Sequence, residues 1–233
     1  MNGVDTTSPD MTRAEMSRAD IQAAIRAAAG KPLDLTGKRL SGLDLSGLDL
    51  HGAVLRAARL NHANLKGARL DGANLDQVWA VDADFSGASL IGASLFQAQL
   101  LRSRFDAADF TNAHVAANFS GASLRGAKLR AAEGAADEKN QSMGLMRATF
   151  MSAHLEGADF TGADLSRADL RYAHGDGADF SGARLREADA SGADLRGARF
   201  EGAATQGLDL DSAQVDTGAV FVGAVHEERA VRK

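Results

Sequence analysis

The sequence of 233 residues predicts an all-β solenoid, and three observations support this fold class. A large apolar residue, most often Leu or Phe, recurs at every fifth position from residue 35 onward. Ala recurs two positions before that residue, and Gly recurs two positions after it. A five-residue period matches neither the helix nor the strand, but it suits a chain that turns a corner after each block of five.

The spacing of the phenylalanines predicts a coil with four sides. Several of these residues lie twenty positions apart, and four blocks of five residues make one turn of twenty. The large residue and the Ala before it then point inward, while Gly occupies the corner. We therefore expect the rings of successive coils to form a core stack, which comprises Phe85, Phe105, Phe160, Phe180 and Phe200.

The composition narrows the classes of function. The chain has no Cys, which excludes thiol nucleophiles and thiolate metal sites and favours a reducing, cytoplasmic location. Its net charge of −5 is unlike that of a nucleic-acid-binding protein. We find neither an apolar signal sequence nor a run of apolar residues that could span a membrane. No P-loop, GxSxG or HExxH motif is present, so we expect neither enzyme activity nor a cofactor.

The N-terminal region predicts a disordered segment, 1–11, followed by a capping helix, 12–30. Thr12 and Glu15 have the spacing of a capping box, and Gly30 is a typical helix end. An apolar stripe within this segment would cover the first coil, and it consists of Met16, Ile21, Ala24, Ile25 and Ala28. The alternative is that this helix binds a partner.

The five-residue pattern predicts two stretches of β-helix, 31–129 and 145–225, with a projecting loop between them and a C-terminal tail. The loop, 130–144, breaks the pattern, and a slip of one residue before Phe119 is undone after it. The loop is either an inert insertion or a contact with a partner. The tail is 226–233. The apolar residues before it either close the last coil or form a dimer contact.

Large apolar residues beside core positions predict an interaction patch. These side chains should face water, where an apolar cluster usually marks an interface. The predicted patch comprises Trp79, Val81, Ile91, Phe96 and Leu101.

Two further rows of outward-facing side chains could bind a ligand or carry a concentrated charge. His154, His174 and Asp194 are twenty residues apart and should stack on one face, where they form a weak candidate metal site. Asp169, Asp189 and Asp209 should form an acidic ladder. Residues 31–130 carry 12 basic and 9 acidic side chains, a net of +3, whereas residues 145–216 carry 7 and 13, a net of −6.

Individual blocks carry a family resemblance. ADFSG, ADLSR, ANLKG, ADFTG and ADLRG resemble the A(D/N)LXX signature of pentapeptide-repeat proteins. The resemblance implies a right-handed quadrilateral β-helix. Residues 31–225 without the 15 of the loop number 180, which gives about nine coils of twenty. Family members that protect type II topoisomerases are thought to imitate duplex DNA, and other members accompany bacterial secretion machinery.

These observations predict a non-enzymatic bacterial protein that acts as a protein–protein interaction scaffold. One alternative is a DNA mimic that binds DNA gyrase or topoisomerase IV, which the acidic ladder favours and its interspersed arginines oppose. Another is an adaptor associated with a secretion system. The expected partner is another protein, or a second copy bound through the C-terminal end or the apolar patch. Direct contact with nucleic acid or membrane is not expected.

Overall fold

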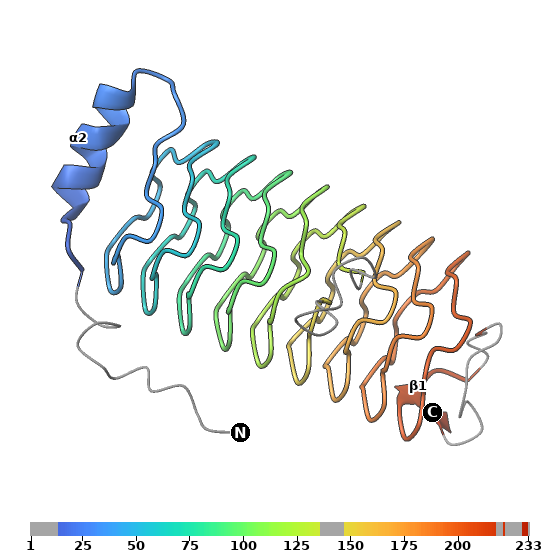
Figure 1. The fold of residues 1–233 in the computed structure, drawn as a ribbon. Coiled ribbons are helices and arrows are strands. Elements are labelled where there is room, and N and C mark those ends of the chain that lie inside the picture. The colour runs from blue at the N-terminus through green and yellow to red at the C-terminus, as the bar shows by residue number, and fades with distance from the viewer. Residues whose placement is uncertain (1–13, 136–146, 218–220, 222–229, 233) are drawn as a thin grey trace, which may run out of the picture.

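A computed structural model describes residues 14–135, 147–217, 221 and 230–232 of the chain. The chain winds into a long stack of similar coils, with α2 (Arg18–Ala28) at the N-terminal end (Figure 1). Near the other end, β1 (Gln214–Val215) pairs in parallel with β2 (Val231–Arg232). The fold is therefore a β-solenoid.

Four ladders of parallel bridges run along the stack, and each lies on one side of the coil. We number them faces 1 to 4 in chain order and call each bridged residue a rung. Face 1 consists of Asp34, Val54, Asn74, Ser94, His114, Glu133, Asp164, Arg184 and Ala204. Face 2 consists of Arg39, Arg59, Trp79, Gln99, Asn118, Thr149, Asp169, Asp189 and Asp209. Face 3 consists of Asp44, Asn64, Asp84, Arg104, Ser123, His154, His174, Asp194 and Gln214. Face 4 consists of Asp49, Arg69, Ser89, Asp109, Lys128, Asp159, Asp179 and Arg199.

The frequent Asp or Asn on these rungs has a local cause. The carboxylate of Asp164 accepts a hydrogen bond from the backbone N–H of Ser166, two residues further on, at 3.1 Å. Asp84 accepts the same bond from Ser86 at 3.0 Å. The side chain thus satisfies a backbone donor at the corner, which is the usual role of Asp and Asn in turns.

The corner residue that follows adopts a left-handed backbone conformation. Gly162, for example, has a φ of 68°. Non-glycine residues also occupy this position, among them Ala57 with a φ of 55°. The recurrent Gly after the core residue therefore reflects a backbone requirement that Gly meets at the lowest cost.

The core is the inside of the coil, where the predicted Leu, Phe and Ala positions are almost fully buried. The phenylalanines stack as expected, but on two sides rather than one. Phe85 and Phe105, with ring centroids 4.7 Å apart, lie behind face 3. Phe160, Phe180 and Phe200 lie behind face 4, with centroids 4.9 and 5.2 Å apart.

The helix α2 begins later than the sequence suggests. Its N-cap is Ser17, which forms a capping box with Asp20. Glu15 instead donates its N–H to the carbonyl of Arg39 at 2.9 Å, and its carboxylate contacts Lys38 at 3.2 Å. Thr12 lies outside the described residues, as does the predicted disordered segment 1–11. Ile21 is fully buried in the core cluster, and Met16 and Ile25 are partly buried against it.

Two irregularities in the coil occur at the same corner, between faces 1 and 2. Successive rungs Gln99 and Asn118 are 19 residues apart, and Asn118 and Thr149 are 31 apart, against 20 in the regular coils. The predicted break at residue 130 is too early, because Glu133 pairs with rungs on both sides of it. The coil continues to Ala135 and is described again from Arg147, and the rest of the predicted loop lies outside the described residues.

The C-terminal end is closed in part by residues after the last coil. Phe221 is buried and lies edge-on to Phe200, with centroids 4.8 Å apart. The segment predicted as a tail, 226–233, contains β2, which extends the ladder of face 3 through β1.

Candidate interaction surface

Part of the predicted apolar patch gathers around face 2. Trp79 is a rung of face 2, and Leu101 is the first residue of the corner between faces 2 and 3. Phe96 lies at the opposite edge of face 2, at the corner with face 1, and stacks on His114 with centroids 5.5 Å apart. All three side chains are half-buried. Face 2 and its edges therefore present three large apolar groups within neighbouring coils.

The other two predicted members do not join this cluster. Val81 is only 3% exposed, so the expectation that it faces water is wrong. It occupies the same corner position as Ser41 and Asn61, which are also buried, and its N–H donates to the side-chain oxygen of Asn61 at 2.9 Å. Ile91 is 43% exposed, but it lies at the corner between faces 4 and 1, diagonally across the coil.

Two exposed side chains at the corner between faces 2 and 3 were not part of the predicted patch. Met151 follows Leu101 along the corner between faces 2 and 3, two coils further on. Tyr172 is 59% exposed and lies against Gly192, where an added Cβ would come within 2.6 Å of the ring. The sequence could have predicted that Met151 is exposed, because Met151 directly follows a core residue, as Leu101 does.

The acidic ladder forms the second half of face 2, as predicted, but its charge is partly neutralised. Asp169 has only 5% of its side chain exposed, and it accepts two hydrogen bonds from Arg171, of 2.9 and 2.7 Å. Arg171 also reaches Asp189 at 3.6 Å, and Arg147 lies 3.8 Å from Asp169. Burial alone would raise the pKa of Asp169, but the hydrogen bonds from Arg171 hold it below its ordinary value.

The histidine row lies on face 3, where its members are consecutive rungs. The rings of His154 and His174 stack with centroids 4.8 Å apart. Glu156 and Arg125 both contact the Nδ1 atom of His154. Asp194 accepts a hydrogen bond from Arg196. Within the described residues, no group of three or more potential ligands has a geometry suited to a metal ion.

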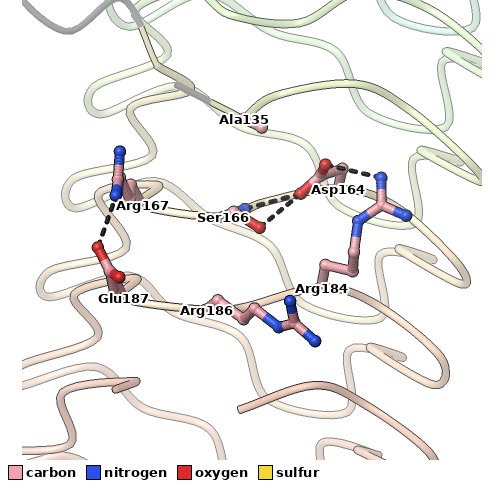
Figure 2. Close-up of a pocket in the computed structure, with 7 residues that line it drawn as sticks. All are labelled: Ala135, Asp164, Ser166, Arg167, Arg184, Arg186 and Glu187. Carbon is pink, nitrogen blue, oxygen red and sulfur yellow. Dashed lines mark hydrogen bonds and ion pairs between the residues drawn. The ribbon is translucent and has the colours of Figure 1, made fainter. Parts of the chain in front are cut away.

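A shallow depression of about 390 Å³ lies at the corner between faces 1 and 2 (Figure 2). Its lining residues are Ala135, Asp164, Ser166, Arg167, Arg184, Arg186 and Glu187. Arg184 pairs with Asp164 and Arg167 with Glu187, each at 2.7 Å, as the dashed lines show. These two ion pairs join neighbouring coils, so the charged side chains that form them are already paired with each other.

None of the helices in the described ranges has the length and apolar character that crossing a bilayer requires.

Comparisons with known proteins agree on the type of repeat. The sequence model for pentapeptide repeats matches eight copies within residues 39–77, 81–115, 145–174 and 163–202. A search of curated proteins finds no match.

Three solved structures illustrate the similarity. HetL, a pentapeptide repeat protein involved in heterocyst differentiation regulation in the cyanobacterium Nostoc, is 29% identical, with 93% of this chain and 94% of HetL covered and a TM-score of 0.38. QnrB1, a plasmid-mediated fluoroquinolone resistance protein, is 19% identical, with coverage of 87% and 90% and a TM-score of 0.43. A pentapeptide repeat protein of the Arabidopsis thaliana thylakoid lumen is 22% identical, with coverage of 75% and 69% and a TM-score of 0.29.

Proposed function

The chain belongs to the pentapeptide repeat family, and from that premise we propose that it is a non-enzymatic scaffold that binds another protein through face 2. We also propose that the solenoid is right-handed, that it has about nine coils, and that α2 caps its N-terminal end.

The observation that carries this proposal is the cluster at face 2 and its two edges. Trp79, Phe96 and Leu101 are large apolar side chains that keep part of their surface accessible. Aromatic residues at the centre of a flat surface are typical anchors of protein interfaces. The repeating coil holds them in a fixed geometry, so little conformational entropy is lost when a partner binds.

The experiment is affinity capture from cells with matched variants. Trp79→Ser and Leu101→Ser remove apolar surface from face 2 and its edge, whereas Ile91→Ser removes it from the diagonally opposite corner. We expect specific partners to be lost with the first two variants and retained with Ile91→Ser. Binding should withstand raised salt, because apolar burial does not depend on unscreened charge. Equal losses with all three variants would contradict the proposal.

A second candidate is binding to a type II topoisomerase by imitation of DNA. The row Asp169, Asp189 and Asp209 favours it, because consecutive carboxylates on one face resemble a phosphate backbone in charge. Arg171 and Arg147 work against it, because they neutralise part of that row. This candidate requires gyrase binding that weakens with salt and with the neutral substitutions Asp189→Asn and Asp209→Asn.

A further inference from the structure

Face 2 separates its charges along the solenoid more completely than the other faces. Its first two rungs are Arg39 and Arg59, its last three are all Asp, and the four between them are uncharged. Face 4 instead places Asp49 next to Arg69 at one end and Asp179 next to Arg199 at the other. Faces 1 and 3 both begin with Asp and carry further carboxylates in their second halves. Among the described rungs, only those of face 2 thus have exclusively basic charges in one half and exclusively acidic charges in the other.

We propose that a second copy of this chain binds face 2 in antiparallel orientation, related by a two-fold axis near Asn118. Asn118 is the fifth of the nine rungs that the described residues supply to this face. With the axis at that rung, Arg39 of one copy lies opposite Asp209 of the other, and Arg59 lies opposite Asp189. This goes beyond the proposed function and rests on it only for the choice of surface. The contact between two copies depends on charge, whereas capture of another protein by the apolar groups of face 2 is expected to withstand salt.

The rungs of the two copies match in register along the whole face. Adjacent rungs are about 4.8 Å apart in any parallel ladder, so two identical ladders stay aligned when one is turned end to end. Every oppositely charged pair therefore forms twice, as a two-fold interface requires. The uncharged centre, which includes Trp79 and Gln99, places no like charges together.

The charged groups are accessible enough to take part. The side chain of Asp189 is 35% exposed, and its contact with Arg171 is a long one of 3.6 Å. Arg39 is 45% exposed and lies 3.5 Å from Glu15. Each can therefore gain a contact across the interface while it keeps its present one. Asp169 is buried beneath Arg171, so the group opposite Trp79 of the other copy is the Arg171 guanidinium, which favours an aromatic face.

The size of the surface predicts a weak dimer. Nine rungs extend over about 38 Å, and a face about 10 Å wide would bury roughly 800 Å² in total, less than stable complexes usually bury. The association should depend on charge and form at about 100 µM protein in low salt, because exposed ion pairs are screened at high salt.

The test is sedimentation equilibrium of the full chain up to about 500 µM, in about 20 mM and about 500 mM salt. We expect a dimer in low salt that weakens at least tenfold in high salt. Arg59→Glu and Asp189→Arg should each weaken it at least tenfold, since each places like charges together twice. An equimolar mixture of the two variants should restore dimers. In the mixed dimer, the carboxylate introduced at position 59 of one chain meets the guanidinium introduced at position 189 of the other, and the native pair forms at the second contact.

The matched controls are Arg69→Glu and Asp179→Arg on face 4. They make the same changes of charge in the same halves of the chain. Asp179 accepts a corner hydrogen bond from the N–H of Ser181, as Asp189 does from the N–H of Ser191, so Asp179→Arg and Asp189→Arg remove equivalent bonds. Both controls should dimerise as the unaltered protein does. Circular dichroism verifies that each variant is folded, and rescue by mixing requires folded chains.

A monomeric unaltered protein, or variants that fail to recover when mixed, would overturn the antiparallel dimer. Either result leaves the proposed scaffold function open to its own test, since face 2 could still capture a different protein. Loss of both dimerisation and capture would overturn both proposals.

Discussion

Ala148 donates its backbone N–H to the carbonyl of Gly134 at 2.8 Å and so joins the coil on either side of residues 136–146. Gly134 occupies a position where most coils have Leu or Phe. A Cβ built on Gly134 would lie 2.8 Å from the Cβ of Ala148 and 3.3 Å from Val115. The two segments are therefore in close contact, and the absence of a side chain at residue 134 makes this contact possible.

Gly134→Ala should destabilise the protein by about 1–3 kcal/mol, because the new methyl group overpacks this site. Urea unfolding followed by circular dichroism measures the effect. Gly162→Ala is the control, since nothing lies within 4 Å of its added Cβ and the cost, about 1 kcal/mol, comes from the left-handed backbone alone. A smaller loss at residue 134 than at residue 162 would contradict the steric account.

Phe180→Ala should lower the free energy of unfolding by about 3–5 kcal/mol. Phe180 is the middle ring of the stack with Phe160 and Phe200, and it is almost fully buried. Its loss leaves a cavity between coils that the rigid ladders cannot close. Phe96→Ala should cost much less, because Phe96 lies at a corner and stacks on His114. Chemical denaturation of both variants under one set of conditions compares them, and equal losses would show that core stacking is not the source of stability.

Stability should fall in acid, and Asp169 should contribute to that fall. Its folded pKa lies below the ordinary value of 3.8, because the bonds from Arg171 outweigh the effect of burial. The unfolded chain therefore takes up its proton first, and the stability that this carboxylate contributes is present above pH 3.8 and is lost as the pH falls through the folded pKa. Thermal melts between about pH 2 and 7 should show a shallower dependence in Asp169→Asn, whereas an unchanged dependence would exclude this contribution.

Gyrase supercoiling should be unaffected by the purified protein at tens of micromolar, with or without a quinolone. The arginines among the Asp rungs of face 2 reduce the resemblance of this row to DNA. Inhibition or protection at low micromolar concentration, reduced by Asp189→Asn, would favour the topoisomerase alternative over the scaffold.

The five-residue period was enough to predict the solenoid, the core residues and the membership of the histidine and aspartate rows. This is possible because each corner restarts the inward and outward pattern, so that the position within a block determines burial. The same rule failed for Val81, because the first corner residue after face 2 is turned inward in that coil and in the two before it. The period of twenty also places Ile91 and Leu101, which are ten residues apart, at diagonally opposite corners, and the prediction of a single patch overlooked this.

The start of the helix shows a second limit. The sequence predicted a capping box at Thr12 and Glu15. The structure uses Ser17 and Asp20, while Glu15 contacts Lys38 and Arg39 of the first coil. These contacts join segments more than twenty residues apart in the chain, and no local pattern contains that information.

The most direct test of the scaffold function is photo-crosslinking in cells that express the protein. A photoreactive amino acid replaces Gln99 at the centre of face 2 or, as a control, Ser89 on face 4. The account predicts discrete adducts from position 99, with another protein or a second copy, and none from position 89. Adducts from position 89 alone, equal adducts from both positions, or none from either would contradict the claim that face 2 is the binding surface.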